Sequence, residues 1–201
     1  MFSFIREWRY STHPARIESK CRRNVFIGSK AAFLLFKDEE VRQFLKFNEA
    51  DETEQDRFFN EMVVTNLVMF LLVLDEQIIE AESSGRKEYL RVLRENIPPF
   101  YYSYLKELGI AAGYVEMWEK LVKLRYDEYD RDRFAWRRAF MDIDYEAATN
   151  KQVMIFQTVA FGLYDHLRRG HASQGDPLFK RIQHSLFPIY KEFMDKIYKI
   201  F

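Results

Sequence analysis

The feature of this sequence that most constrains its fold is the segment 52–84, which contains neither glycine nor proline. Asp51 and Thr53 are residue types that cap helix N-termini, and Gly85 follows the segment directly, so one long helix is predicted here. Its middle part, Met62–Leu74, is apolar on every side of such a helix. A helix of that kind is stable in water only when neighbouring elements surround it. We therefore predict a central buried helix within a helical bundle.

The rest of the sequence also shows helical periodicity, interrupted by glycine, proline and polar turns. Gly28 is expected to interrupt one helix and Pro188 to kink the last. Pro98 and Pro99 are expected to separate two short helices. The helices predicted around the central one cover residues 2–10, 14–26, 38–49, 86–96, 100–108, 114–140, 153–169 and 177–197.

Composition agrees with an all-α fold of six to eight helices around the central one. The chain has 201 residues, of which 48% are apolar and only 12 are glycine or proline (7 Gly and 5 Pro), so it can fold on its own core. We predict a single domain over 1–201, in which 1–12 form a short amphipathic N-terminal helix or arm. Cys21 is the only cysteine, which is typical of a protein of the cytoplasm. The apolar stretch Met62–Leu74 is shorter than the roughly twenty residues of a membrane span, so no transmembrane segment is expected.

The charge of the chain is zero overall but unevenly distributed. Residues 1–37 carry eight basic and two acidic side chains, whereas residues 38–82 carry thirteen acidic and three basic ones. We expect the two parts to pair inside the fold, although each could instead face a separate partner. A basic N-terminal part also occurs in mitochondrial presequences, but Glu7 and Glu18 disfavour that interpretation. Because no basic bias extends over the whole chain, nucleic acid is not an expected partner.

Side chains suited to catalysis are few and scattered. None of the four histidines has the spacing that places two metal ligands on one helix face, and no phosphate-binding loop or nucleophile motif occurs. Asp165 and His166 are adjacent, so on a helix they point in different directions, and we interpret the pair as structural. Cys21 lies between Lys20 and Arg22, whose charges favour a thiolate, but a lone helical cysteine is usually a small packing residue. We interpret Cys21 in that way.

The acidic pair Asp127 and Asp130 is the sharpest candidate for a metal site. Three residues apart on one helix face, the two carboxylates could hold Mg²⁺ together with water. Arginines interleave with them, however, and Arg131 lies four residues after Asp127, the spacing of a helical ion pair. We favour the ion pair, and we predict neither tight metal binding nor a cofactor.

Aromatic residues, at 17% of the chain, are unusually frequent. Aromatic side chains are enriched at protein interfaces and in ligand pockets, so their exposed members are the candidate binding residues. The candidate partner-binding residues are Phe2, Phe4, Ile5, Trp8, Tyr101 and Tyr102. The favoured hypothesis is a helical interaction protein, an adaptor, scaffold or regulator without catalytic activity, that binds another protein or a second copy of itself. The alternative is a helical ligand-binding protein or metal-dependent enzyme with a site assembled from distant helices.

The N-terminal segment 1–12 is expected to dock on something, because its apolar side chains are too many for a short helix alone in water. Arg6 and Arg9 flank these side chains and suit either an acidic protein face or anionic lipid. Docking within the protein or a dimer is expected ahead of another partner, and a peripheral membrane contact is the remaining alternative.

Overall fold

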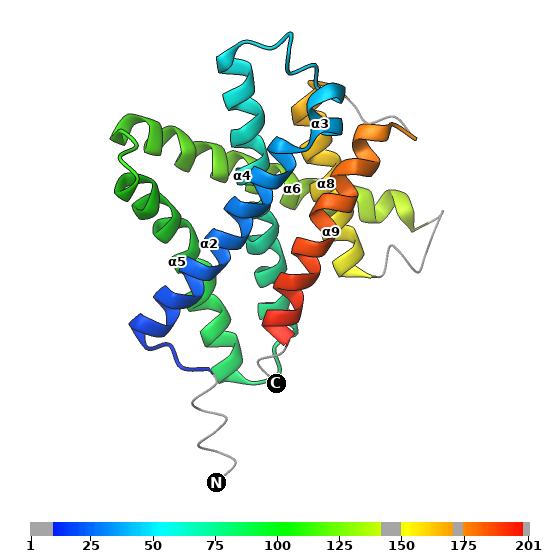
Figure 1. The fold of residues 1–201 in the computed structure, drawn as a ribbon. Coiled ribbons are helices and arrows are strands. Elements are labelled where there is room, and N and C mark those ends of the chain that lie inside the picture. Colours follow the sequence, from blue (N-terminus) through cyan, green and yellow to red (C-terminus); the bar gives the residue numbers. More distant parts are fainter. Residues whose placement is uncertain (1–9, 142–149, 171–174, 199–201) are drawn as a thin grey trace.

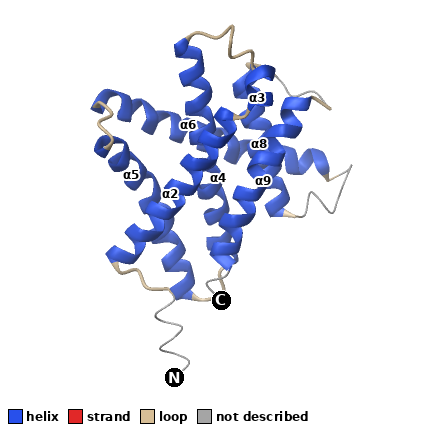
Figure 2. Ribbon diagram, viewed as in Figure 1, coloured by secondary structure: helices blue, strands red, loops and turns tan. Residues whose placement is uncertain are grey.

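The computed structural model describes residues 10–141, 150–170 and 175–198, and all regular elements in these ranges are helices (Figures 1 and 2). This confirms the predicted all-α bundle, and six helices pack around the central one within the described ranges. The helices are α2 (Pro14–Lys37), α3 (Glu39–Phe44), α4 (Glu52–Glu80), α5 (Ser84–Glu107), α6 (Ala112–Phe140), α8 (Lys151–Arg168) and α9 (Pro177–Tyr198). The helix predicted over residues 2–10 lies outside the described residues, apart from Tyr10.

Helix α4 is the central helix, as predicted. It packs against α2, α5, α6, α8 and α9, and every side chain from Met62 to Leu74 is buried. The carboxylate of Asp51 caps its N-terminus by accepting a hydrogen bond from the Glu54 N–H at 2.8 Å. The helix ends at Glu80, earlier than predicted, because the Ser83 hydroxyl accepts from the Arg86 N–H and starts α5 there.

By length and apolar composition, α4 could cross a membrane. In the bundle, 78% of its most apolar 18-residue stretch is buried against the other helices. Core helices of folded domains have the same composition, so this feature is weak support for a membrane span.

Helix α2 continues through Gly28 to Lys37, so the predicted interruption is wrong. Gly28 is buried, and a Cβ at this position would lie 3.2 Å from the ring of Phe70 in α4. The glycine lowers helix propensity by about 1 kcal/mol but allows the two helices to approach closely. Its role is packing between helices and not helix termination.

The predicted break at Pro98 and Pro99 is also wrong, because both prolines lie inside α5. The α5 residues Leu93, Ile97 and Tyr101 are buried at four-residue spacing on both sides of the proline pair. Burial of this face outweighs the local cost of proline, which removes one N–H donor and crowds the preceding turn. Pro188 likewise lies inside α9.

The other helix boundaries follow local capping chemistry. Helix α3 begins where the Asp38 carboxylate accepts from the Val41 N–H at 3.0 Å, but it ends at Phe44 and not near 49 as predicted. Lys46, with a φ of 53°, belongs to the turn that replaces the rest of this helix. Asn150 caps α8, and the Leu178 N–H of α9 donates to Asp176 at 2.8 Å.

Candidate functional site

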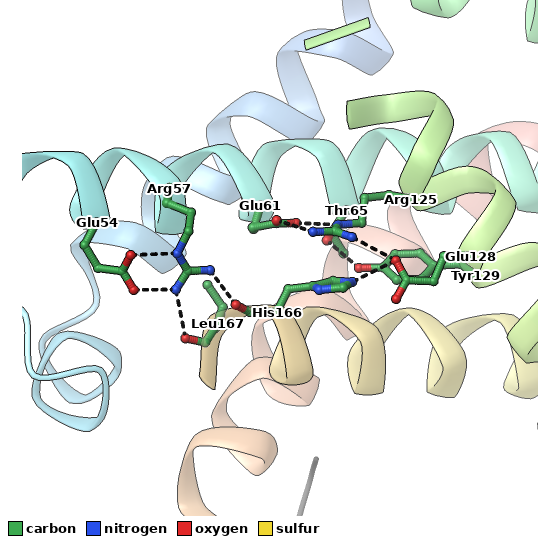
Figure 3. Close-up of polar contacts among 9 residues, drawn as sticks. All are labelled: Glu54, Arg57, Glu61, Thr65, Arg125, Glu128, Tyr129, His166 and Leu167. Atoms are coloured by element: carbon green, nitrogen blue, oxygen red, sulfur yellow. Dashed lines mark hydrogen bonds and ion pairs between the residues drawn. The ribbon is translucent and has the colours of Figure 1, made fainter. Parts of the chain in front are cut away.

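A partly buried polar layer joins α4, α6 and α8 (Figure 3). The Arg125 guanidinium donates to both carboxylate oxygens of Glu61, at 2.6 and 2.9 Å, and to Glu128 at 2.9 Å. His166 from α8 lies 3.1 Å from the same Glu128 oxygen. Three helices thus contribute to one chain of contacts, which we call the polar layer: Glu61, Arg125, Glu128 and His166.

Burial and charge act in opposite directions on the pKa values in the polar layer. Burial opposes the charged form of Arg125, but the hydrogen bond and the charge of Glu61 outweigh it and raise the pKa of Arg125. Burial would raise the pKa of Glu128, yet His166 and Arg125 outweigh it and lower that pKa. The side chain of Glu61 is only 6% exposed, and its bidentate contact with Arg125 satisfies both of its carboxylate oxygens. Within the polar layer, the positive charge of Arg125 therefore stabilises the carboxylates of Glu61 and Glu128.

Next to the polar layer lies Tyr129, which is fully buried. Its hydroxyl is 3.2 Å from the Thr65 hydroxyl, and burial raises the pKa of Tyr129, so the phenol is neutral. A Cβ at Gly162 of α8 would lie 2.1 Å from the Tyr129 ring, closer than atoms can approach. Gly162 therefore provides the space in which the ring packs between α4, α6 and α8.

Arg57 connects α4 to the end of α8 (Figure 3). Its guanidinium binds the Glu54 carboxylate and donates to the backbone oxygens of His166 and Leu167. These are carbonyls in the last turn of α8, which have no partner within the helix, so Arg57 acts as a C-terminal cap. The contact joins the N-terminal part of α4 to the C-terminal end of α8.

Of the metal candidates Asp127 and Asp130, only Asp130 forms an ion pair among the described residues. Asp130 binds Arg133, at 2.7 Å, and Arg133 also binds Glu76 at 2.6 Å. Asp127 is exposed, and the predicted pair with Arg131 is not formed among the described residues, where Arg131 lies 3.5 Å from Asp132 instead. In the part of the chain that the structure describes, no three His, Cys, Asp or Glu side chains gather to hold a metal ion. The prediction that this pair binds no metal tightly stays a prediction.

Among the described residues, the acidic part of the chain forms ion pairs inside the fold with basic residues of later segments. Its inter-helix partners include arginines of later helices, in the pairs Asp38–Arg181, Glu61–Arg125, Asp75–Arg94 and Glu76–Arg133, and Lys151 of α8, which pairs with Glu76 and Glu80. Internal pairing of the acidic part is thus found with later helices, and its predicted pairing with residues 1–37 stays a prediction. Contacts between residues so far apart in sequence leave no local signal.

Cys21 is a packing residue, because it is 1% exposed and burial raises its pKa to about 11. Tyr101 is also buried, with its ring edge-to-face against Trp118 at 5.6 Å between centroids. Tyr102 is half-buried, and burial raises its pKa to about 12. The other four candidate binding residues, Phe2, Phe4, Ile5 and Trp8, lie outside the described residues.

The N-terminal half of α6 carries an apolar stripe on its outer side, which the sequence reasoning missed. We call Tyr114, Met117, Leu121 and Leu124, spaced three and four residues apart, the α6 stripe. Tyr114, Met117 and Leu124 are 60%, 55% and 57% exposed, and Leu121 is half-buried. Helical periodicity alone did not reveal it, because the same spacing marks core faces and docking faces.

A hollow of about 720 Å³ adjoins the α6 stripe, between α2, α4, α5 and α6. Figure 1 shows the turn between α5 and α6 at the outer edge of the bundle, and residues of this turn form part of the hollow. The hollow is lined by Ser29, Asp56, Phe59, Asn60, Val63, Tyr101, Tyr104, Leu105, Leu108, Gly109, Ile110, Ala111, Tyr114 and Trp118.

Comparison of the chain with protein-family models, with curated proteins and with solved structures finds no significant match in any of the three.

Proposed function

We propose that this protein is a helical interaction protein that docks an amphipathic helix of another protein along the α6 stripe. The observation that carries the proposal is the exposure of Met117 and Leu124, each more than half exposed, on one side of a helix. Folded monomers rarely leave contiguous apolar surface exposed without a binding function.

The spacing within the α6 stripe suits a helix as the partner. Steps of three and four residues place apolar side chains in a row, as on the contact faces of paired helices. A partner helix would bury the row with its own apolar residues at matching spacing. The core side of α6 carries Val115, Val122 and Tyr129, and the half-buried Leu121 also packs against the core, whereas Met117 and Leu124 are exposed.

The contacts of the polar layer favour this proposal over an enzymatic one. A catalytic acid, base or nucleophile needs a free position toward its substrate. Arg125 and Glu128 instead use their polar atoms on one another and on neighbouring helices, and Tyr129 is buried as a neutral phenol. These contacts hold helices together.

Substitution of the stripe tests the proposal. Met117→Glu with Leu124→Glu introduces two charges where a partner would bury apolar surface, so we expect binding of the partner to fall at least about tenfold. Phe187→Glu on α9, where the phenylalanine is 53% exposed, is the matched control and should retain binding. The readout is affinity capture from lysate with crosslinking, which must place the captured protein on α6.

Two outcomes would contradict the proposal. Capture that survives the double substitution, or that Phe187→Glu reduces equally, would show that the stripe is not the docking surface. Light scattering that finds a dimer dissociated by the double substitution would identify a second copy of this chain as the occupant, in place of another protein.

A further inference from the structure

The hollow beside the α6 stripe has the size and shape of a small-molecule site. Its volume of about 720 Å³ falls within the range of pockets that hold ligands, about 300–1,000 Å³. Its walls come from four helices, which are fixed by the core through Val63, Tyr101 and Leu105. A site built on packed helices is already formed before a ligand arrives.

Aromatic rings make up much of the wall of the hollow. Five of its lining residues are aromatic: Phe59, Tyr101, Tyr104, Tyr114 and Trp118. The faces of aromatic rings carry partial negative charge, and they attract ammonium and guanidinium groups as well as apolar ones. The rings therefore favour a ligand that is apolar, cationic or both.

The charge of the lining decides between these alternatives. Among the residues that the structure describes, Asp56 is the only charged one that lines the hollow, and no described lysine, arginine or histidine does so. Within the described residues, the side chain of Asp56 has no ionic or hydrogen-bonding partner, whereas Glu54, Glu61 and Glu76 of the same helix are each bound to an arginine. The hollow thus offers a carboxylate whose charge is not compensated by the protein.

Two polar side chains that line the hollow with Asp56 are also available to bind a ligand. Asn60 lies one helical turn after Asp56 on α4, and Ser29 of α2 lines the same hollow. Neither side chain has a partner within the described residues. A small number of convergent polar groups in an apolar pocket is the pattern that orients a ligand.

We propose that the hollow between α2, α4, α5 and α6 binds a hydrophobic organic cation, in which the ammonium group faces Asp56 and the apolar part lies against the aromatic wall. This goes beyond the docking function and does not depend on it. The neighbouring hollow between α2 and α5 is lined by Arg22 and Arg23, so it would disfavour the same ligand.

A matched set of probes tests the proposal: octyltrimethylammonium, octanol and octanoate, which share one alkyl chain and differ in charge. Binding is measured by calorimetry and by saturation-transfer NMR. We expect the cation to bind about tenfold more tightly than octanoate, with octanol between them. Equal binding of the three probes, or no saturation transfer to the cation, would overturn the proposal.

Variants then locate the site. Asp56→Asn should weaken cation binding about threefold and leave octanol unchanged, because it removes charge and keeps shape. Asp127→Asn, which neutralises an exposed aspartate outside the hollow, is the control and should change neither. Tyr114→Leu keeps an apolar side chain but removes a ring, so it should weaken binding of the cation more than binding of octanol. A loss caused equally by Asp127→Asn, or cation binding that Asp56→Asn and Tyr114→Leu both leave unchanged, would contradict the assignment. Tyr114 also belongs to the α6 stripe, but Asp56 lies outside it, so the Asp56→Asn result separates cation binding from partner docking.

Discussion

Substitution of Gly162 by alanine provides the sharpest test of how α8 packs on α6. The new Cβ would lie 2.1, 2.7 and 2.9 Å from three ring atoms of Tyr129, which is fully buried and cannot move into solvent. Alanine gains about 1 kcal/mol of helix propensity. Overpacking costs about 1–3 kcal/mol, and displacement of the ring also weakens the hydrogen bond to Thr65, worth about 1 kcal/mol. We expect a net loss of about 1–3 kcal/mol.

Urea unfolding and thermal melting measure this loss. For a chain of 201 residues the melting temperature should fall by about 2–12 °C. Gly85→Ala is the control, because nothing lies within 4 Å of that position, and it should be neutral or slightly stabilising. In a Tyr129→Leu background the added methyl group should no longer destabilise, since the ring is gone. A change below about 0.5 kcal/mol for Gly162→Ala in the wild-type background would refute the close contact.

Three further predictions concern charge and burial. Arg125→Met should destabilise the fold by about 3–5 kcal/mol in urea unfolding, because it leaves Glu61 buried without a countercharge, and adding Glu61→Leu should recover most of the loss. The lowered pKa values of Asp38 and Glu128 contribute stability that is full above their unfolded values near pH 4 and is lost as pH falls through the lower folded values. At pH values below about 4, the urea concentration at the unfolding midpoint should therefore decrease. Glu128→Gln should make this decrease smaller. Cys21, with a pKa of about 11 against an ordinary 9.0, should have a thiolate fraction roughly a hundredfold lower than an exposed thiol, so a thiol reagent should modify it quickly only in urea.

The parts of the fold that the sequence predicted are those governed by local rules. The central helix follows from an apolar segment with a capping aspartate, and the starts of α8 and α9 follow from the capping residues Asn150 and Asp176. Gly28 and the proline pair in α5 were misread because tertiary packing decides there. Gly28 serves contact with Phe70, and Ile97 anchors α5 on the core beside Pro98.

The polar layer was not predictable in the same way. Glu61 and Arg125 are 64 residues apart in sequence, and Glu128 and His166 are 38 apart, so no spacing rule within one helix links them. The local rule even misled at Asp127, where a four-residue spacing suggested a pair with Arg131 that does not form among the described residues. Pairing between helices depends on which faces meet, and that is set by the whole core.

The two sides of α6 separate stability from binding, which makes the proposed function testable without ambiguity. Val115 and Val122 are 3% exposed and face the core, whereas Met117 and Leu124 each follow one of them by two residues and therefore point to the opposite side. Replacing the outer pair by glutamate removes no core contact, so the free energy of unfolding should change by less than about 0.5 kcal/mol. Met117 and Leu124 are more than half exposed in one row with Tyr114, and a contiguous apolar row of this kind suits the docking of a partner. If Met117→Glu with Leu124→Glu instead destabilised the bundle as a core substitution does, the outer side of α6 would be part of the fold and the docking proposal would fail.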